Sequence, residues 1–264
     1  MCLGGSENVL DNLKLVRDQI WVLIAKDFKL KYNATAIGFL WCMLVPFFTT
    51  LIYYFVFGVM MRWSAKNYLL YLISGNFLWQ FFANVISMNG HVLIANSALL
   101  KKTSFDRRLL VISTFFTEGM HFLLTIPILL GIMRYYHVTP QWWSVLPNLV
   151  VCLLSLALIS IGIGYFYAAA NLWFRDLERI IGILLMAWCF MSPVFIPMSN
   201  VPEKWQFIYD INPMALVLRI WRNIFYEPAF DPSLYAPPLV IGLILFLLGR
   251  AFFSRYDAKF AEMM

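Results

Sequence analysis

The sequence predicts an all-α membrane protein with six transmembrane helices. Of its 264 residues, 62% are hydrophobic, 18% are aromatic and only 13% are charged, and the mean hydropathy is +0.74. A water-soluble fold cannot bury that much apolar surface. Apolar stretches recur from residue 36 to residue 253 without a polar half that could fold separately. We therefore expect a single domain covering residues 1–264.

Six segments are long and apolar enough to cross a bilayer, because a helix needs roughly 20 predominantly apolar residues to do so. The predicted spans are 36–61, 68–94, 109–133, 147–174, 180–198 and 234–253. Glu118 is the only charged residue well inside the first five, and Arg250 lies near the end of the sixth, where its side chain can reach the headgroups. An even number of crossings places both termini on the same side.

The basic residues predict which side that is, since Lys and Arg are more frequent in cytoplasmic loops. If the N-terminus is inside, few of the 20 Lys and Arg residues face outward: Arg62, Lys66, Arg134, Lys204, Arg219 and Arg222. All the others lie in cytoplasmic segments, so we expect both termini in the cytoplasm. The net charge of +6 then reflects topology and does not indicate nucleic-acid binding, which needs a concentrated basic face.

An amphipathic helix is expected before the first span, over residues 8–32. Its apolar residues recur at spacings of three and four, with charged residues between them: Leu13, Val16, Ile20, Ile24 and Phe28. This pattern favours a helix that lies in the cytoplasmic interface of the membrane. A soluble helix that packs against the rest of the chain is the alternative.

A compact basic turn joins the second and third spans, over residues 99–108. Its charges could serve only as an orientation signal. Its apolar residues Leu99, Leu100 and Phe105 would be poorly placed in a fully solvated loop, however, so we favour a docking element for a cytoplasmic partner.

The segment 199–233, between the fifth and sixth spans, is too apolar for a free loop and too charged to cross the membrane. Pro193, Pro197 and Pro202 interrupt any continuous helix at its start, and Pro213 begins a new amphipathic piece. We expect short re-entrant helices that dip into the outer leaflet.

Two further features bear on chemistry. Glu118 is followed three residues later by His121 on the same helical face, and an ionisable pair inside a membrane can form a proton relay. A buried interhelical hydrogen bond, to Asn84, Asn89 or His91, is the interpretation that we favour. The four cysteines are scattered through the sequence, so neither a disulfide framework nor a metal site is expected.

Several stretches, in their order and spacing, resemble ABC-2-type polysaccharide export permeases, the transmembrane subunits that export O-antigen, capsule and teichoic-acid chains. The matching stretches are KDFKLKY at 26–32, IGFLW at 37–41 with Pro46, LKK at 100–102 with Phe105 and Arg107, FRD at 174–176 with Ile180, SPVF at 192–195, PEKW at 202–205, NP at 212–213 and RYDAKF at 255–260. One departure is Asp106, where many members have Pro. The loss of this proline is expected to leave the turn less rigid.

The resemblance implies a bacterial inner-membrane homodimer that works with two copies of a nucleotide-binding subunit and moves a lipid-linked polysaccharide, most simply O-antigen. ATP and Mg²⁺ would bind that partner, since the chain has no G-x-x-x-x-G-K-[ST] motif, and the chain itself would be neither an enzyme nor a cofactor-binding protein.

The resemblance also implies roles for individual residues. The residues expected to couple to the nucleotide-binding subunit are Leu99, Leu100, Lys101, Lys102, Phe105, Arg107, Arg108, Arg175 and Asp176, with Lys26, Lys29 and Lys31 of the interface helix. A candidate substrate path at the dimer interface contains Phe39, Trp41, Tyr53, Tyr54, Trp188 and Phe195, because aromatic rings stack on sugars, although packing alone would also explain them. The external gate region is expected to contain Pro193, Pro197, Pro202, Trp205 and Pro213.

Three alternatives stay open at this point. An ABC-2 exporter of a drug or a lipid would have the same architecture. A proton-coupled secondary transporter would use Glu118 and His121 as carriers, but the chain lacks internal repeats and a second acid in mid-span. A membrane-embedded enzyme acting on lipid-linked sugars would need a cluster of acids, histidines or metal ligands at one depth, which the spans do not supply.

Overall fold

The computed structural model describes residues 4–32, 38–62, 65–100, 105–140, 142–226 and 230–260, and every regular element in these ranges is a helix. The longer elements are α1 (Gly4–Tyr32), α2 (Trp41–Tyr53), η2 (Tyr54–Met60), α3 (Tyr68–Ala95), α5 (Arg108–Tyr135), α6 (Trp142–Asn171), α7 (Leu177–Phe190), α8 (Glu203–Ile211), α9 (Pro213–Phe225) and α10 (Ala236–Phe260). The short ones are η1 (Gly38–Leu40), α4 (Ser97–Leu100), η3 (Met198–Asn200) and η4 (Pro232–Leu234). The expectation of an all-helical fold is confirmed for these residues.

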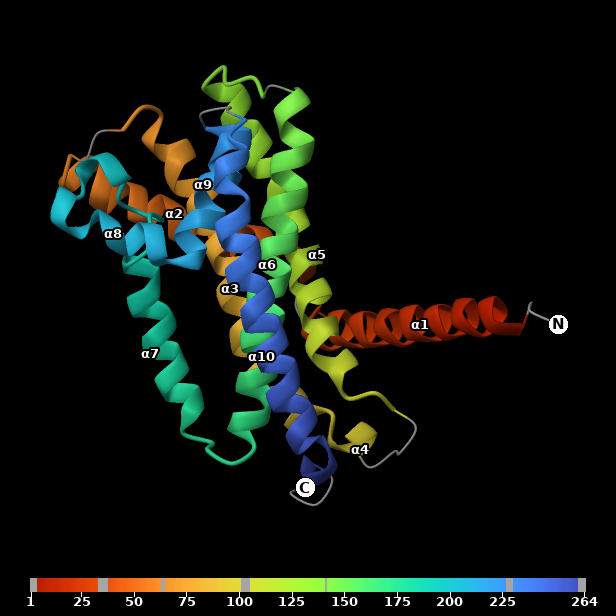
Figure 1. Cartoon of the computed structure of the whole chain (residues 1–264). Helices are drawn as coiled ribbons and strands as arrows, with labels where there is room; N and C mark the ends of the chain where they lie inside the picture. The colour runs from red at the N-terminus through yellow and green to blue at the C-terminus, as the bar shows by residue number, and fades with distance from the viewer. Residues whose placement is uncertain are drawn as a thin grey trace.

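Helices α3, α5, α6 and α10 run side by side as an upright bundle (Figure 1). The core lies around α3, where Leu78 and Phe82 have no exposed surface, and Leu156 and Ile159 of α6 are equally buried. These side chains fill the centre of the bundle, so the described helices of one chain enclose no wide conduit between them. By contrast, α2 and η2 are largely exposed.

Five of the described helical segments are long and apolar enough to cross a membrane: Trp41–Met60, Tyr68–Ala95, Arg108–Tyr135, Trp142–Asn171 and Pro232–Asp257. They correspond to the first four predicted spans and the sixth. Residues 36 and 37 of the first predicted span lie outside the described residues.

The predicted fifth span, 180–198, differs from the helix that forms there. Helix α7 has 14 residues and ends at Phe190, which corresponds to a length of about 21 Å. Pro193 explains the early end, because proline has no backbone N–H for a helical hydrogen bond and disfavours helix at the residue before it. Six crossings therefore remain a prediction.

Helix α1 projects sideways from the bundle, nearly perpendicular to the upright helices (Figure 1). Its C-terminal half packs against α5, where Leu23 and Ile24 are buried and the ring of Phe28 lies 4.7 Å from that of His121. Trp21 and Val22, on another face, are exposed. The amphipathic helix expected over 8–32 is thus a helix that touches the bundle at one end, and its position in the membrane interface remains a prediction.

The segment after α7 forms two short helices, as expected, and α9 is the more buried of them. Leu216, Ile220 and Phe225 of this helix are all buried. Helix α9 packs against α3, α6 and α10 and lies towards the end of the bundle opposite to α4 (Figure 1). The dip of these helices into the outer leaflet remains a prediction.

Glycines allow α6 and α10 to approach closely along their lengths. A Cβ atom at Gly162 would lie 2.6 Å from the backbone carbon of Leu245 and 2.6 Å from the backbone nitrogen of Phe246. On the facing helix, a Cβ atom at Gly249 would collide with the carbonyl oxygen of Gly162. Small residues at helix–helix contacts are typical of membrane bundles, where backbone packing contributes much of the stability.

Replacing Gly162 with Ala is therefore expected to lower the free energy of unfolding by about 1–3 kcal/mol, because the added methyl meets backbone that cannot yield locally. Gly131 is the matched control, since nothing lies within 4 Å of a Cβ atom placed there. Thermal unfolding of both variants in detergent would check this. If Gly162→Ala is as stable as Gly131→Ala, the close packing of α6 on α10 at Gly162 does not contribute to the free energy of unfolding.

Candidate functional site

The basic turn before α5 is held by an ion pair within it. The backbone N–H of Arg108 donates to Asp106 Oδ1 at 3.0 Å, and its Nε and Nη2 atoms donate to the two carboxylate oxygens at 2.9 Å each. Burial raises the pKa of Asp106, but these bonds from Arg108 outweigh it and hold that pKa below its usual value. Asp106 thus fixes the side chain of Arg108 at the start of α5, and the expected effect of the missing proline on the rigidity of the turn stays a prediction.

The same turn is also tied to the end of α10. Arg107 Nη1 donates to the carbonyl oxygen of Asp257 at 2.6 Å and to its Oδ1 at 3.1 Å. Leu99 and Phe105 are partly buried against an apolar cluster of this chain that includes Phe253. Internal packing therefore accounts for these two apolar side chains without a partner protein, and the case for docking rests on the charged residues.

The remaining residues expected to couple to a partner are less fully described. Lys101 and Lys102 lie outside the described residues, as does the side chain of Leu100. Arg175 and Asp176 are exposed in the turn between α6 and α7. That turn lies at the same end of the molecule as α4 and the C-terminal end of α10 (Figure 1).

Two of the three lysines in the C-terminal part of α1, Lys26, Lys29 and Lys31, bind the bundle. Lys26 Nζ donates to Oδ1 of Asn96, which follows the end of α3. Lys31 Nζ lies 3.1 Å from Oε1 of Glu118 on α5. Lys29 is exposed. The C-terminal half of α1 is therefore fastened to the bundle by charge as well as by apolar packing.

Glu118 is at the centre of an ion cluster between α1 and α5. Its side chain is 2% exposed, and its second carboxylate oxygen lies 3.1 Å from Nδ1 of His121. Lys31 supplies the opposite charge from α1. A cavity of about 360 Å³, lined also by Trp41 and Asn84, adjoins the cluster.

The interhelical partner suggested for Glu118 was Asn84, Asn89 or His91, whereas the structure assigns this role to Lys31. Asn89 accepts a hydrogen bond from Thr114 at 2.7 Å instead. His91 lies 3.2 Å from Glu178. The interpretation of Glu118 as a structural, interhelical residue fits this arrangement, with a different partner.

The aromatic residues proposed for a substrate path divide into a packed group and an exposed residue. The ring of Phe195 lies 4.5 Å from that of Tyr53 and 5.3 Å from that of Phe190, and Phe195 is only 2% exposed. Trp41 is exposed. In this conformation Phe195 is covered by its neighbours and offers no open face to a sugar.

Two further members of this set are also packed. Trp188 lies edge-on to Phe82 at 5.2 Å, and Tyr54 lies 6.3 Å from Tyr68. The side chain of Phe39 lies outside the described residues. Trp188 and Tyr54 are partly exposed, and a sugar-stacking role for this set remains a prediction.

Asn212 joins the end of α7 to the start of α9. Its Oδ1 accepts from the backbone N–H of Met214 at 3.0 Å and from Trp188 Nε1 at 2.8 Å. Its Nδ2 donates to the carbonyl of Met191 at 3.0 Å and to Ser192 Oγ at 2.9 Å. With Pro213 in the first helical position, Asn212 is the N-cap of α9.

Arg222 of α9 holds the backbone of the segment that follows α7. Its Nη1 atom donates to the carbonyl of Pro193 at 2.5 Å, and its Nη2 atom donates to the carbonyls of Tyr71 and Val194 at 3.3 Å each. The guanidinium also lies 3.5 Å from the ring centre of Tyr71. Gly75 leaves the space that this guanidinium occupies.

Two tyrosines of α3 bind the same segment from the other side. Tyr71 Oη donates to the carbonyl of Pro193 at 2.8 Å, and Tyr68 Oη donates to the carbonyl of Phe195 at 3.0 Å. Helices α3 and α9 therefore satisfy the carbonyls of Pro193, Val194 and Phe195, which lie between α7 and η3 and outside any helix.

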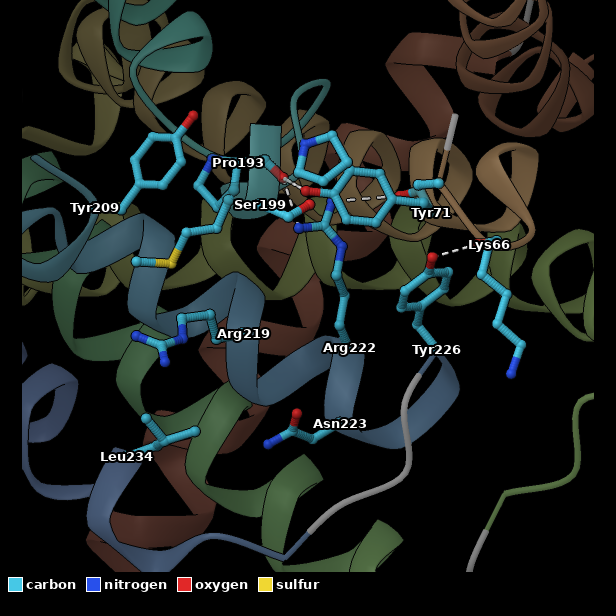
Figure 2. Close-up of a pocket in the computed structure, with 13 residues that line it drawn as sticks. Lys66, Tyr71, Pro193, Ser199, Tyr209, Arg219, Arg222, Asn223, Tyr226 and Leu234 are labelled. Carbon is cyan, nitrogen blue, oxygen red and sulfur yellow. Dashed lines mark hydrogen bonds between the residues drawn. The ribbon is translucent and has the colours of Figure 1, made fainter. Parts of the chain in front are cut away.

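A cavity of about 500 Å³ opens beside this clamp, and Figure 2 shows the residues around it. Pro193 and Pro197, from the predicted gate region, line it. Pro202 and Trp205 line a neighbouring cavity of about 370 Å³. Residues 193–202, with α8 and α9, thus form one connected region at the end of the bundle opposite to the turn at 105–108.

The chain matches the family described as ABC-2 type transporter over residues 18–226. It is 34% identical over 255 residues to an O-antigen export system permease protein RfbA of Klebsiella pneumoniae. The aligned region is 96% of this chain and 97% of that protein. This chain belongs to the ABC-2 type transporter family.

Other relatives agree with this membership of the ABC-2 type transporter family. An O-antigen export system permease protein RfbA of Myxococcus xanthus is 31% identical over 245 residues, covering 91% of this chain and 93% of that protein. A polysialic acid transport protein KpsM of Escherichia coli is 20% identical over 207 residues, covering 76% and 78%. The resemblance stated from the sequence motifs is confirmed.

Sequence reasoning missed the residues that organise the end of this ABC-2 transporter chain opposite to α4. Arg222 was counted only as an external charge, and Tyr68, Tyr71 and Asn212 were given no role. One sequence signal was available for Arg222, because it lies in the strongly apolar amphipathic stretch of α9. Its contacts could not be found that way, because its partners are backbone carbonyls of residues far away in the sequence.

Proposed function

We propose that this chain is the transmembrane subunit of an ATP-driven exporter that moves a lipid-linked polysaccharide, most simply O-antigen, from the cytoplasm across the bacterial inner membrane. The observation that carries the proposal is similarity of 31–34% identity, over nearly the whole chain, to proteins named O-antigen export system permease. This favours a polysaccharide over a drug or a small lipid as the substrate.

The working unit in this proposal is a homodimer. The centre of one chain is filled by buried side chains such as Leu78 and Phe82, so a conduit wide enough for a glycan needs a second copy. Helices α2 and α7 are the candidates to line it, because they carry exposed apolar side chains such as Phe48 and Met186. The predicted six crossings, with α7 and the segment that follows it as the fifth, would keep both termini in the cytoplasm.

The energy in this proposal comes from two copies of a separate nucleotide-binding subunit, which would hold ATP and Mg²⁺. They would dock at the end of the bundle that bears α4, the turn at 105–108 and the turn at 175–176. The motion would reach the bundle through α5, which begins at the turn. It would also reach it through α1, which Lys31 fastens to α5.

Deletion of the gene is expected to remove O-antigen from the cell surface, and this chain supplied on a plasmid is expected to restore it. Co-purification with the presumed nucleotide-binding subunit should yield a complex whose ATPase activity is higher than that of the subunit alone. Normal surface O-antigen in the deletion strain would overturn the polysaccharide assignment. A flux driven by a pH gradient without any ATPase complex would instead support the proton-coupled alternative.

A further inference from the structure

The external cavity beside Arg222 is rich in hydrogen-bond donors. Figure 2 shows 13 residues around it, three of which are cationic: Lys66, Arg219 and Arg222. Arg219, Arg222 and Asn223 come from one face of α9, because their spacings are three and four residues. Within the part of the chain that the structure describes, no Asp or Glu lines the cavity.

Arg222 gives this cavity a buried positive charge. The side chain is 7% exposed, and its donors reach carbonyl oxygens, which are neutral acceptors. Among the described residues, no carboxylate pairs with it, and its Nε atom is buried without a hydrogen-bond partner. A buried cation without a counter-charge is costly, so an anion that enters beside it is favoured.

The other two cations add to this potential and stay accessible. Arg219 is 38% exposed, and its nearest acid, Asp210, lies 3.5 Å away and is itself exposed. Lys66 is exposed at the other side of the opening. The cavity therefore carries an excess of positive charge, with two side chains free to adjust to a ligand.

The donor set distinguishes between classes of ligand. A neutral sugar would find acceptors in this lining, such as Ser199 and Asn223, but it would leave the charge of Arg222 without a counter-charge. Ionised phosphate groups present mainly acceptors and bind arginine in a fixed geometry. The volume of about 500 Å³ and the apolar lining of Pro197, Met198 and Leu234 leave room for more than the phosphate itself.

From these observations we propose that the cavity binds the phosphate group of an anionic lipid at the outer face of the membrane. In this proposal Arg219 and Lys66 contact the phosphate directly. Arg222, which is buried, attracts it by its positive charge. Pro197, Met198 and Leu234 contact the part of the lipid that is esterified to the phosphate. In an exporter of lipid-linked glycan, such a site would hold a lipid phosphate next to the proline segment that Arg222 clamps. The proposal rests on the external placement of α9 in the proposed function, and it does not depend on which polymer is moved.

Calorimetric titration of the full chain in an uncharged detergent tests the site directly. The probes are dihexanoyl-phosphatidylglycerol, dihexanoyl-phosphatidylcholine and inorganic phosphate. The anionic lipid is expected to bind saturably and about tenfold more tightly than either of the other probes. The double variant Lys66→Gln/Arg219→Gln is expected to bind it about tenfold more weakly, since each lost group is a charge-assisted hydrogen-bond donor.

Arg134→Gln/Lys204→Gln is the matched control, because it removes two cations that are exposed and do not line the cavity. This control should bind the anionic lipid as the unchanged chain does. Equal binding by the Lys66→Gln/Arg219→Gln variant and the unchanged chain would overturn the site, and equal affinity for inorganic phosphate would overturn its assignment to a lipid. Failure of the exporter function would appear separately, as normal surface O-antigen in the deletion strain.

Discussion

Replacing Lys31 with Met is expected to lower the free energy of unfolding by about 3 kcal/mol, because it leaves the buried carboxylate of Glu118 without its cation. Glu118 is 2% exposed, whereas the side chain of Lys31 is 45% exposed. The loss therefore comes mainly from the unpaired acid, with His121 as its remaining partner. Denaturant or thermal unfolding in detergent measures the effect, and export should fall with it because apolar packing alone then holds α1 to α5.

Lys29→Met is the matched control, because Lys29 lies on the same helix and is exposed. Its stability should equal that of the unchanged chain. Adding Glu118→Gln to Lys31→Met should recover most of the lost stability, since the uncompensated charge is then gone. If Lys31→Met behaves like Lys29→Met, the cluster does not hold α1 to α5.

The rescued double variant also separates two mechanisms. An ATP-driven exporter should retain part of its export in Lys31→Met/Glu118→Gln, because coupling through the turn and α5 remains and no proton passes through Glu118. A proton-coupled transporter would lose flux completely when its carboxylate becomes an amide. Surface O-antigen in cells carrying this variant is the measurement.

The second large effect is expected at the basic turn. Reversing charge in Lys101→Glu/Lys102→Glu should reduce export at least about tenfold, because a docking ion pair becomes a like-charge repulsion. Membrane insertion should be intact, since the contacts with the bundle made by Arg107, Leu99 and Phe105 are unchanged in this variant. ATPase activity and surface O-antigen, measured on the same strain, would show hydrolysis continuing without transport.

The two arginines of the turn are left unchanged in this test because they make contacts within the chain. A reversal at Arg107 would also break its bonds to Asp257, and one at Arg108 would break those to Asp106. Either change would confuse docking with folding. Arg134→Glu/Lys204→Glu, at the other end of the molecule, reverses the same amount of charge and should export normally. Normal export by the Lys101→Glu/Lys102→Glu variant would remove the docking role.

Most of the helices could be predicted, because membrane spans depend on the length and apolarity of local sequence. The spans predicted at 68–94 and 109–133 differ from α3 and α5 by at most two residues at either end. The fifth was harder, because apolarity continues through 191–198 although Pro193 and Pro197 prevent regular helix there. Hydropathy counts apolar residues and does not detect where backbone hydrogen bonding stops.

The individual contacts of the candidate sites were less predictable. Glu118 was recognised as unusual, but its partner Lys31 lies on a helix that the sequence placed at the membrane surface. Leu99 and Phe105 were assigned to a partner protein, yet they pack against this chain. In each case the sequence indicates that a polar or apolar side chain needs a partner. It does not identify that partner, because many residues of a suitable type are available.

The sequence by itself determined the membrane class, the positions of the longest helices and the family, because apolar length, charge distribution and ordered motifs are all properties of the linear chain. The tertiary structure decided which groups meet: Lys31 with Glu118, Asn212 with the end of α7, and Arg222 with the carbonyls of 193–194. Hydrogen bonds and ion pairs act over a few ångströms between residues that can be more than a hundred positions apart. Only the packed arrangement of the helices sets those distances.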